Sequence, residues 1–132
     1  MMTLSQIDHV ALAVREPAKS AEWYRSVLGL ERRHQQVWGD WPIMMCAGET
    51  CLALFPAKGD KIAGPSPNVA MRHLAFRVDK KNFALAQAEL QRRQIAFEFQ
   101  DHQIAHSIYF HDPDGYQLEI TTYDLGPATS SL

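Results

Sequence analysis

The chain has 132 residues, close to the usual size of one domain, and we expect residues 1–132 to fold as a single domain. Lysine and arginine number 13 against 15 aspartate and glutamate residues, which leaves no basic surface for nucleic acid. The 46% hydrophobic and 21% charged fractions exclude a disordered or fibrous protein. Because the sequence shows neither a signal peptide pattern nor an apolar run that could span a membrane, we predict a soluble cytoplasmic protein with no membrane partner.

The first half of the chain indicates one strand, one helix and three further strands. Apolar residues at three- to four-residue spacing predict a helix that begins at Ala18, and Gly29 suits its C-terminal cap. A turn is expected over 39–42, where Gly and Pro occur together. The predicted strands of this half are 7–14, the stretch around 33–38, 43–47 and 51–55.

The second half repeats this order after a connection over 57–71 that is rich in Gly and Pro. A shift of 64 residues aligns His9 and Ala11 with His73 and Ala75. The pattern predicts an α+β fold of two βαβββ modules, which form a cup-shaped mixed sheet with the helices on its outer face. The expected segments are module 1 at 5–56, module 2 at 72–124 and a tail at 125–132, with strands at 72–78, 95–100, 107–110 and 116–123, a helix through 83–90 and a turn at 112–115.

Three side chains are predicted to share the sheet face that the helices leave open. Alternate residues of a strand point to opposite faces, which places His9, His73 and Glu119 opposite the bulky residues that meet the helices. Taken singly, a strand histidine or glutamate is more often structural or solvated. Together, two imidazoles and a carboxylate suit a divalent transition metal with open coordination positions.

Four segments of the chain resemble the vicinal oxygen chelate superfamily, which includes glyoxalase I, fosfomycin resistance enzymes, extradiol dioxygenases, methylmalonyl-CoA epimerase and bleomycin resistance proteins. The segments are 7–14, 23–30, 72–76 and 108–120, within a resemblance that covers 5–124. The resemblance implies that His9, His73 and Glu119 bind Fe2+, Mn2+, Ni2+ or Zn2+, and that a small-molecule substrate chelates this ion through adjacent oxygens. It also implies a homodimer with swapped modules and the metal site at the interface.

The resemblance leaves the reaction open. Ala53 stands where glyoxalase I carries a further glutamate ligand, and 97–105 contains no Lys or Arg where fosfomycin enzymes carry a cationic cluster. Tyr109 matches a tyrosine of extradiol dioxygenases, but no histidine occurs between positions 35 and 72, where those enzymes carry an acid–base histidine. His102 or His106 could take this role only if their loop folds inward. We therefore expect a metal-dependent enzyme that is dioxygenase-like or lyase/isomerase-like. The alternative is a non-catalytic binding protein of the bleomycin resistance type.

Further residues are candidates for contacts with the substrate. Tyr109 is predicted to be catalytic, by transferring a proton or orienting the substrate, and its alternative role is that of a wall aromatic. Arg77 is either an anchor for a substrate carboxylate or a surface partner of Asp79. The candidates for an apolar wall, with ordinary core packing as the alternative, are Trp38, Trp41, Met44, Met45 and Phe55. The remaining histidines are expected at the surface or in loops, and they are His34, His102, His106 and His111.

Two cysteines, Cys46 and Cys51, flank a predicted hairpin turn over 47–50. Their positions on facing strands would permit a cross-strand disulfide. Because the cytoplasm keeps thiols reduced, we expect instead two thiols that pack as small residues.

Overall fold

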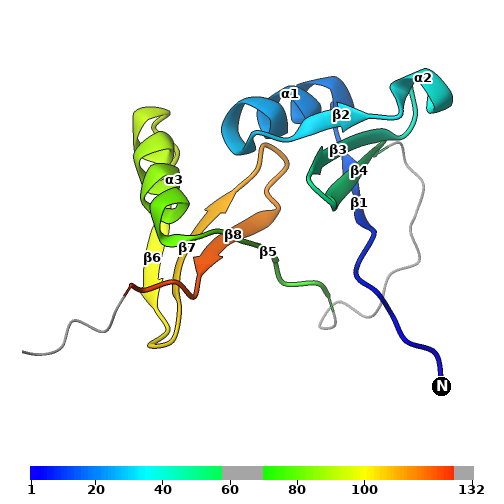
Figure 1. Ribbon diagram of the computed structural model, residues 1–132. Helices are drawn as coiled ribbons and strands as arrows, with labels where there is room; N and C mark the ends of the chain where they lie inside the picture. Colours follow the sequence, from blue (N-terminus) through cyan, green and yellow to red (C-terminus); the bar gives the residue numbers. More distant parts are fainter. Residues whose placement is uncertain (58–69, 127–132) are drawn as a thin grey trace, which may run out of the picture. The chain divides into compact units, whose positions relative to one another are not determined.

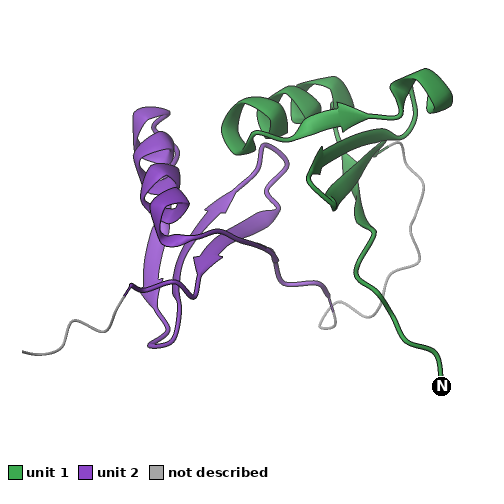
Figure 2. Cartoon of the chain, in the orientation of Figure 1, with its two compact units in different colours: residues 1–63 green, residues 64–132 purple. Residues whose placement is uncertain are grey.

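The computed structural model describes residues 1–57 and 70–126. Two compact units, 1–63 and 64–132, each contain one four-stranded sheet (Figures 1 and 2). The predicted connection over 57–71 and the predicted tail over 125–132 lie almost wholly outside the described residues. Within the described part of the chain, no helix is both long enough and apolar enough to cross a membrane.

The first unit is a mixed sheet with one long helix packed against it. Its elements are β1 (His9–Val14), α1 (Pro17–Leu28), β2 (Glu31–Arg33), α2 (Gln35–Trp38), β3 (Ile43–Ala47) and β4 (Thr50–Pro56). The strand order is β1-β4-β3-β2, in which β1 runs parallel to β4 and the other pairs are antiparallel. Helix α1 contacts β3 and β4.

The second unit repeats this topology. Its elements are β5 (Leu74–Arg77), α3 (Lys80–Arg92), β6 (Glu98–Asp101), β7 (His106–His111) and β8 (Gln117–Thr122). The strand order is β5-β8-β7-β6, in which β5 runs parallel to β8, and α3 contacts β8. The predicted α+β fold of two βαβββ modules is therefore confirmed.

Strand alternation separates a core face from a second face in both sheets. In β1, Leu12 and Val14 are buried, whereas His9 and Ala11 are exposed. The buried bulky residues of the other strands follow the same alternation, and they include Leu52, Leu54, Ile108, Phe110, Leu118 and Ile120. The core face in each unit also receives a buried helical side chain, Tyr24 from α1 or Leu90 from α3. The second face is thereby left for the candidate site.

Two predicted strands are wrong in position, and in both cases a left-handed residue explains the difference. The stretch over 33–38 is one turn of helix, α2, after the short β2, because His34 takes φ 65° and its carbonyl accepts from the N–H of Trp38 at 2.9 Å. The strand predicted over 95–100 begins only at Glu98. Gln94 has φ 58°, and the N–H of Ile95 donates to the Leu90 carbonyl at 2.9 Å. Residues 94 and 95 therefore terminate α3, and β6 starts only after them.

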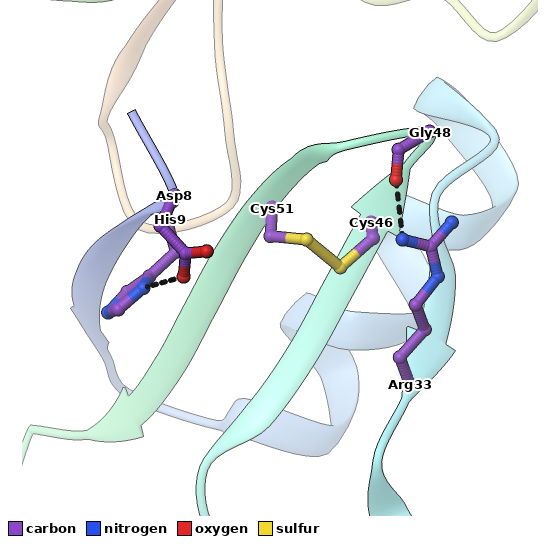
Figure 3. The surroundings of a disulfide bond; sticks show 6 residues. All are labelled: Asp8, His9, Arg33, Cys46, Gly48 and Cys51. Carbon is purple, nitrogen blue, oxygen red and sulfur yellow. Dashed lines mark hydrogen bonds and ion pairs between the residues drawn. A yellow bond between two sulfur atoms is a disulfide. The ribbon is translucent and has the colours of Figure 1, made fainter. Parts of the chain in front are cut away.

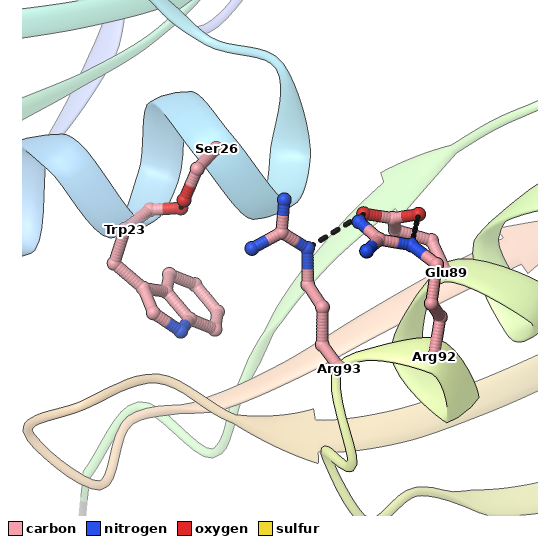
Figure 4. Close-up of polar contacts among 5 residues, drawn as sticks. All are labelled: Trp23, Ser26, Glu89, Arg92 and Arg93. Atoms are coloured by element: carbon pink, nitrogen blue, oxygen red, sulfur yellow. Dashed lines mark hydrogen bonds and ion pairs between the residues drawn. The ribbon is translucent and has the colours of Figure 1, made fainter.

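The last turn of α3 carries a charge cluster on its surface (Figure 4). Both Arg92 and Arg93 lie 2.6 Å from Oε1 of Glu89. Hydrogen bonds from Arg92 and then Arg93 lower the pKa of the Glu89 carboxyl to about 2. The carboxylate therefore stays ionised well into the acid range, and these exposed contacts are a feature of the helix surface rather than of the core.

The C-terminal cap of α1 gives a test of the backbone. Gly29 has φ 72°, and its N–H donates to the Arg25 carbonyl at 3.1 Å. Apart from Gly29 and its two chain neighbours, no described residue has an atom within 4 Å of the position that a Cβ would take, so a side chain there costs only backbone strain. We expect Gly29→Ala to lower the free energy of unfolding by about 1 kcal/mol in urea titrations. The matched Gly29→Asn variant should lose less, because asparagine tolerates this region, and equal losses would contradict the explanation.

Candidate functional site

A polar row crosses the middle of the second unit's sheet. Glu119 on β8 is paired with Ala75 on β5 and with Tyr109 on β7. Residues in direct register share a face, so the Glu119 and Tyr109 side chains lie on the side opposite the core residues Leu118 and Ile120. On this face, Ala75 places only a methyl group beside the carboxylate.

The row gains a histidine at the N-terminal end of β5. His73 directly precedes this strand, and its Nε2 lies 2.9 Å from Oε1 of Glu119. The His73 side chain is 33% exposed, whereas that of Glu119 is 10% exposed. The structure thus brings two of the three predicted ligands together, with the carboxylate buried and the imidazole accessible.

The second oxygen of Glu119 is held by the sheet itself. The buried Ser107 hydroxyl donates to Oε2 at 2.7 Å and lies 2.9 Å from Oγ1 of Thr121. Because the Ser107 hydroxyl has one proton, it can donate to only one of these two oxygens. The Glu119 carboxylate is the favoured acceptor, since it is charged and lies at the shorter distance. Such outer hydrogen bonds orient the ligands of metal sites. Sequence reasoning missed Ser107, although it lies two residues before Tyr109 on the same strand face.

The His73 and Glu119 pair fits one edge of a coordination sphere. Two ligand atoms at about 2.1 Å from one ion lie about 3 Å apart when the angle between them is near a right angle. The observed separation of 2.9 Å matches this, and imidazole with carboxylate is a suitable donor set for divalent transition metals. In residues 1–57 and 70–126, no group of three or more His, Cys, Asp or Glu side chains is gathered as a complete metal site. A metal ion at this pair would therefore need a third protein ligand from elsewhere.

His9 occupies the equivalent place in the first unit. It stands two residues before Ala11, which pairs with Ala53, just as His73 stands two residues before Ala75. Its Nδ1 lies 2.8 Å from the Asp8 carboxylate (Figure 3), and its side chain is 44% exposed. This contact leaves Nε2 available for coordination. Because His9 belongs to the other unit, its approach to His73 and Glu119 stays a prediction.

Tyr109 has a partner that the sequence did not reveal. Its hydroxyl lies 3.0 Å from Nε2 of His102, and its ring meets the His73 ring edge-on with centroids 5.7 Å apart. Burial, followed by the nearby Glu119 carboxylate, raises the pKa of the Tyr109 phenol, so the hydroxyl keeps its proton at neutral pH. His102 is exposed in the turn between β6 and β7, as expected of a loop residue, but its ring reaches back to the polar row.

The other histidines have local contacts of their own. The His34 ring lies 4.8 Å from that of Trp38. The His106 ring lies 5.3 Å from Phe99, and its Nε2 is 3.6 Å from Asp101. His111 is exposed at the end of β7.

The predicted substrate-contact residues fall on both units. In the second unit, the Arg77 guanidinium lies over the Tyr123 ring, 4.6 Å from its centroid, and Arg77 is in register with Thr121 on the face of the polar row. In the first unit, Phe55 is 40% exposed and shares a face with Ala53. Trp38 on α2 and Trp41 in the following turn are 44% and 48% exposed.

The methionines of β3 divide between the two faces of the first sheet. Met44 pairs with Ala53 and belongs to a buried apolar cluster with it and Cys46, whereas Met45 pairs with the core residue Leu52. Only Met44 therefore lies on the face of His9.

The expectation of reduced cysteines is not borne out, because Cys46 and Cys51 form a disulfide (Figure 3). The two residues are directly opposed on β3 and β4, with Cα atoms 4.2 Å apart. The hairpin register brings the two sulfur atoms together, whereas the sequence argument had rested on the redox state of the compartment.

Comparison with known proteins connects these features to one superfamily. The family model described as Glyoxalase/Bleomycin resistance protein/Dioxygenase superfamily matches residues 6–120. The metallothiol transferase FosB of Staphylococcus epidermidis is 31% identical over 122 residues, which cover 90% of this chain and 84% of the relative. The glutathione transferase FosA of Serratia marcescens is 26% identical over 117 residues, which cover 89% of this chain and 80% of the relative.

Solved structures share the fold. A lactoylglutathione lyase from Agrobacterium tumefaciens superposes with a TM-score of 0.71 at 21% identity, covering 92% of this chain and 96% of the other. The oxidase ChaP-H2 superposes with a TM-score of 0.71 at 23% identity, covering 92% of this chain and 94% of the other.

Proposed function

Because this chain belongs to the glyoxalase/bleomycin resistance protein/dioxygenase superfamily, we propose that it is a metal-dependent enzyme whose small substrate binds through two adjacent oxygen atoms. The observation that carries the proposal is the His73 and Glu119 pair, held at 2.9 Å with the carboxylate buried. We propose His9 as the third ligand. The two units would then act as modules of one domain in a cytoplasmic homodimer, with the metal site at or near the subunit interface.

The proposed ligands leave room for a substrate. Three protein ligands do not fill the coordination sphere of Fe2+, Mn2+, Ni2+ or Zn2+. When bound, such an ion supplies Lewis acidity toward the oxygens of the substrate. Ser107 fixes the orientation of Glu119, and the accessible His73 lies at the open side of the pair.

Tyr109 and His102 are proposed to handle protons or orient the substrate. The Tyr109 hydroxyl stands on the strand next to Glu119, and His102 contacts it from the exposed turn. A proton at the phenol therefore has a path to solvent through the imidazole. The arrangement supports proton transfer in a lyase or isomerase reaction, and orientation of a hydroxylated substrate in a dioxygenase reaction.

The charges near Tyr109 bear on the substrate class. Glu98 on β6 is in direct register with Tyr109, and Asp101 follows at the end of that strand. The segment 97–105 contains no Lys or Arg. By strand alternation Asp101 points to the other face, so Glu98 is the carboxylate beside Tyr109. Its charge disfavours a doubly charged anionic substrate, so we propose a substrate whose chelating oxygens carry little charge before binding.

Transfer of a small thiol is a second candidate reaction. It is favoured by two curated relatives, which are a metallothiol transferase and a glutathione transferase. A binding protein without turnover is the remaining alternative.

One set of measurements tests these proposals. We would determine the metal content of the untagged protein and reconstitute it anaerobically with Fe2+, Mn2+, Ni2+ or Zn2+. Each form would be screened with catechols, with hemithioacetals and with glutathione plus an epoxide. We expect turnover by at least one form and its loss on chelation. Tight ligand binding by chelated protein without turnover would favour the binding protein, and a failure of all four ions to bind would overturn the metal site.

Ser107→Ala tests how the carboxylate is held. Loss of the 2.7 Å hydrogen bond frees Oε2 of Glu119, so we expect metal affinity to fall about tenfold in chelator competition. Ser26→Ala on α1 is the control, since that hydroxyl donates to the Trp23 carbonyl within its own helix (Figure 4). Equal affinities of wild type and Ser107→Ala would remove Ser107 from the site.

A further inference from the structure

The disulfide hairpin of the first unit has supports that do not involve sulfur. Cys46 and Cys51 are five positions apart, and the pairing of β3 with β4 runs from Ile43 opposite Leu54 to the turn. The Arg33 guanidinium donates to the Gly48 carbonyl in that turn (Figure 3). A cross-link that closes so short a loop restricts the unfolded chain least. We therefore expect the hairpin to fold with the cysteines either reduced or oxidised.

The two sulfur-bearing residues differ in accessibility. Cys46 is 1% exposed and belongs to the apolar cluster with Met44 and Ala53. Cys51 is partly exposed, and β4 lies beside the edge strand β1. Thiol–disulfide exchange needs direct approach of a thiolate to one sulfur. Cys51 packs against the same apolar cluster but is the more exposed residue of the pair, so we assign the approach to Cys51. The two cysteines therefore differ in which one an external thiol or disulfide meets first.

We propose that Cys46 and Cys51 form a thiol–disulfide exchange site for small-molecule thiols and disulfides of the glutathione class. Cys51 is the residue that forms the mixed disulfide with the small molecule, and Cys46 is the resolving thiol that attacks Sγ of Cys51. The exchange itself requires only these two residues and no metal ion. His9 is the register partner of Cys51 on β1, so a group attached to Cys51 lies next to this histidine.

The exchange is balanced in two steps. The Cys51 thiolate attacks one sulfur of oxidised glutathione, which forms a mixed disulfide on Cys51 and releases one glutathione thiolate. The Cys46 thiolate then attacks Sγ of Cys51, which forms the protein disulfide and releases the second glutathione thiolate. Two protein thiols are oxidised by two electrons, and both of their protons pass to the released glutathione.

The test uses the full chain treated with a chelator, so that its outcome does not depend on metal binding. After reduction with dithiothreitol, the protein is incubated with oxidised glutathione and followed by intact mass and thiol titration. We expect wild type to lose both thiols reversibly. Cys46→Ser should accumulate one glutathionyl group on Cys51, and Cys51→Ser should be modified at least about tenfold more slowly. Circular dichroism checks the fold of each variant and of the reduced protein.

Two results would overturn the proposal. One is reduced wild type that keeps two free thiols in oxidised glutathione, and the other is modification of Cys51→Ser as fast as of Cys46→Ser. If a variant does not fold, brief alkylation of reduced wild type followed by peptide mapping decides instead. Labelling of Cys51 ahead of Cys46 supports the assigned direction, and equal labelling refutes it.

Discussion

Replacement of His73 with alanine is expected to lower the affinity for divalent metal by more than about 100-fold. Loss of an outer hydrogen-bond partner costs a metal site 10–100-fold, and loss of a direct ligand should cost more. The substitution removes the imidazole nitrogen 2.9 Å from Oε1 of Glu119 and leaves one protein ligand in the second unit. Competition with a chromophoric chelator measures the change, and metal analysis of the purified variant should find less than wild type.

The control for this prediction is His111→Ala. This exposed histidine lies at the end of β7 in the same unit. The variant therefore also loses one imidazole, but it leaves His73 and Glu119 in place. The fold should survive in both variants, because His73 is one-third exposed and precedes β5. Unchanged metal content in His73→Ala, with its circular dichroism intact, would remove the proposed site.

Replacement of Tyr109 with phenylalanine is expected to lower kcat by at least about 100-fold while metal content is unchanged. A positioned acid or base commonly contributes 10²–10⁴-fold to a rate, and this variant loses only the hydroxyl that lies 3.0 Å from His102. The ring that packs edge-on against His73 is retained. Steady-state kinetics with the substrate found by screening, together with metal analysis, measures both quantities.

The matched control is Tyr123→Phe, whose ring stays under Arg77 when the hydroxyl is lost. His102→Gln should have a smaller effect than Tyr109→Phe, because His102 acts through the phenol. Full turnover by Tyr109→Phe would show that this tyrosine only lines the site as an aromatic ring and that its hydroxyl is not catalytic. A rise in KM without a fall in kcat would indicate that the hydroxyl binds substrate but takes no part in the chemical step.

Strand alternation and repetition made most of the fold predictable. The strand over 43–47 and the Gly29 cap follow directly from residue type, and the two matching orders of elements establish the modules. The errors lie where single residues adopt left-handed conformations. His34 and Gln94 carry no sequence signal as strong as a glycine, so the strands predicted beside them were misplaced.

Alternation also predicted which residues share the face of Glu119. Tyr109 was instead singled out by the family resemblance, and alternation applied to β7 would have placed both Tyr109 and Ser107 on that face. The sequence left open whether His102 reaches the site, because the path of a turn determines its position and turns carry no periodicity. The disulfide was missed for a different reason, since the compartment argument concerns redox state whereas hairpin register decides proximity.

The two units differ at one equivalent position of their sheets. Ala53 pairs with Ala11 in the first unit, whereas Glu119 pairs with Ala75 in the second. Ala53 is 1% exposed and packs with Met44 and Cys46, so a carboxylate introduced there would be buried without a compensating partner. In the proposed ligand set, the second half therefore supplies the carboxylate and one imidazole, and the first half supplies only His9. We therefore expect Ala53 to accept only small apolar replacements, so a further carboxylate ligand cannot be gained there without a loss of stability.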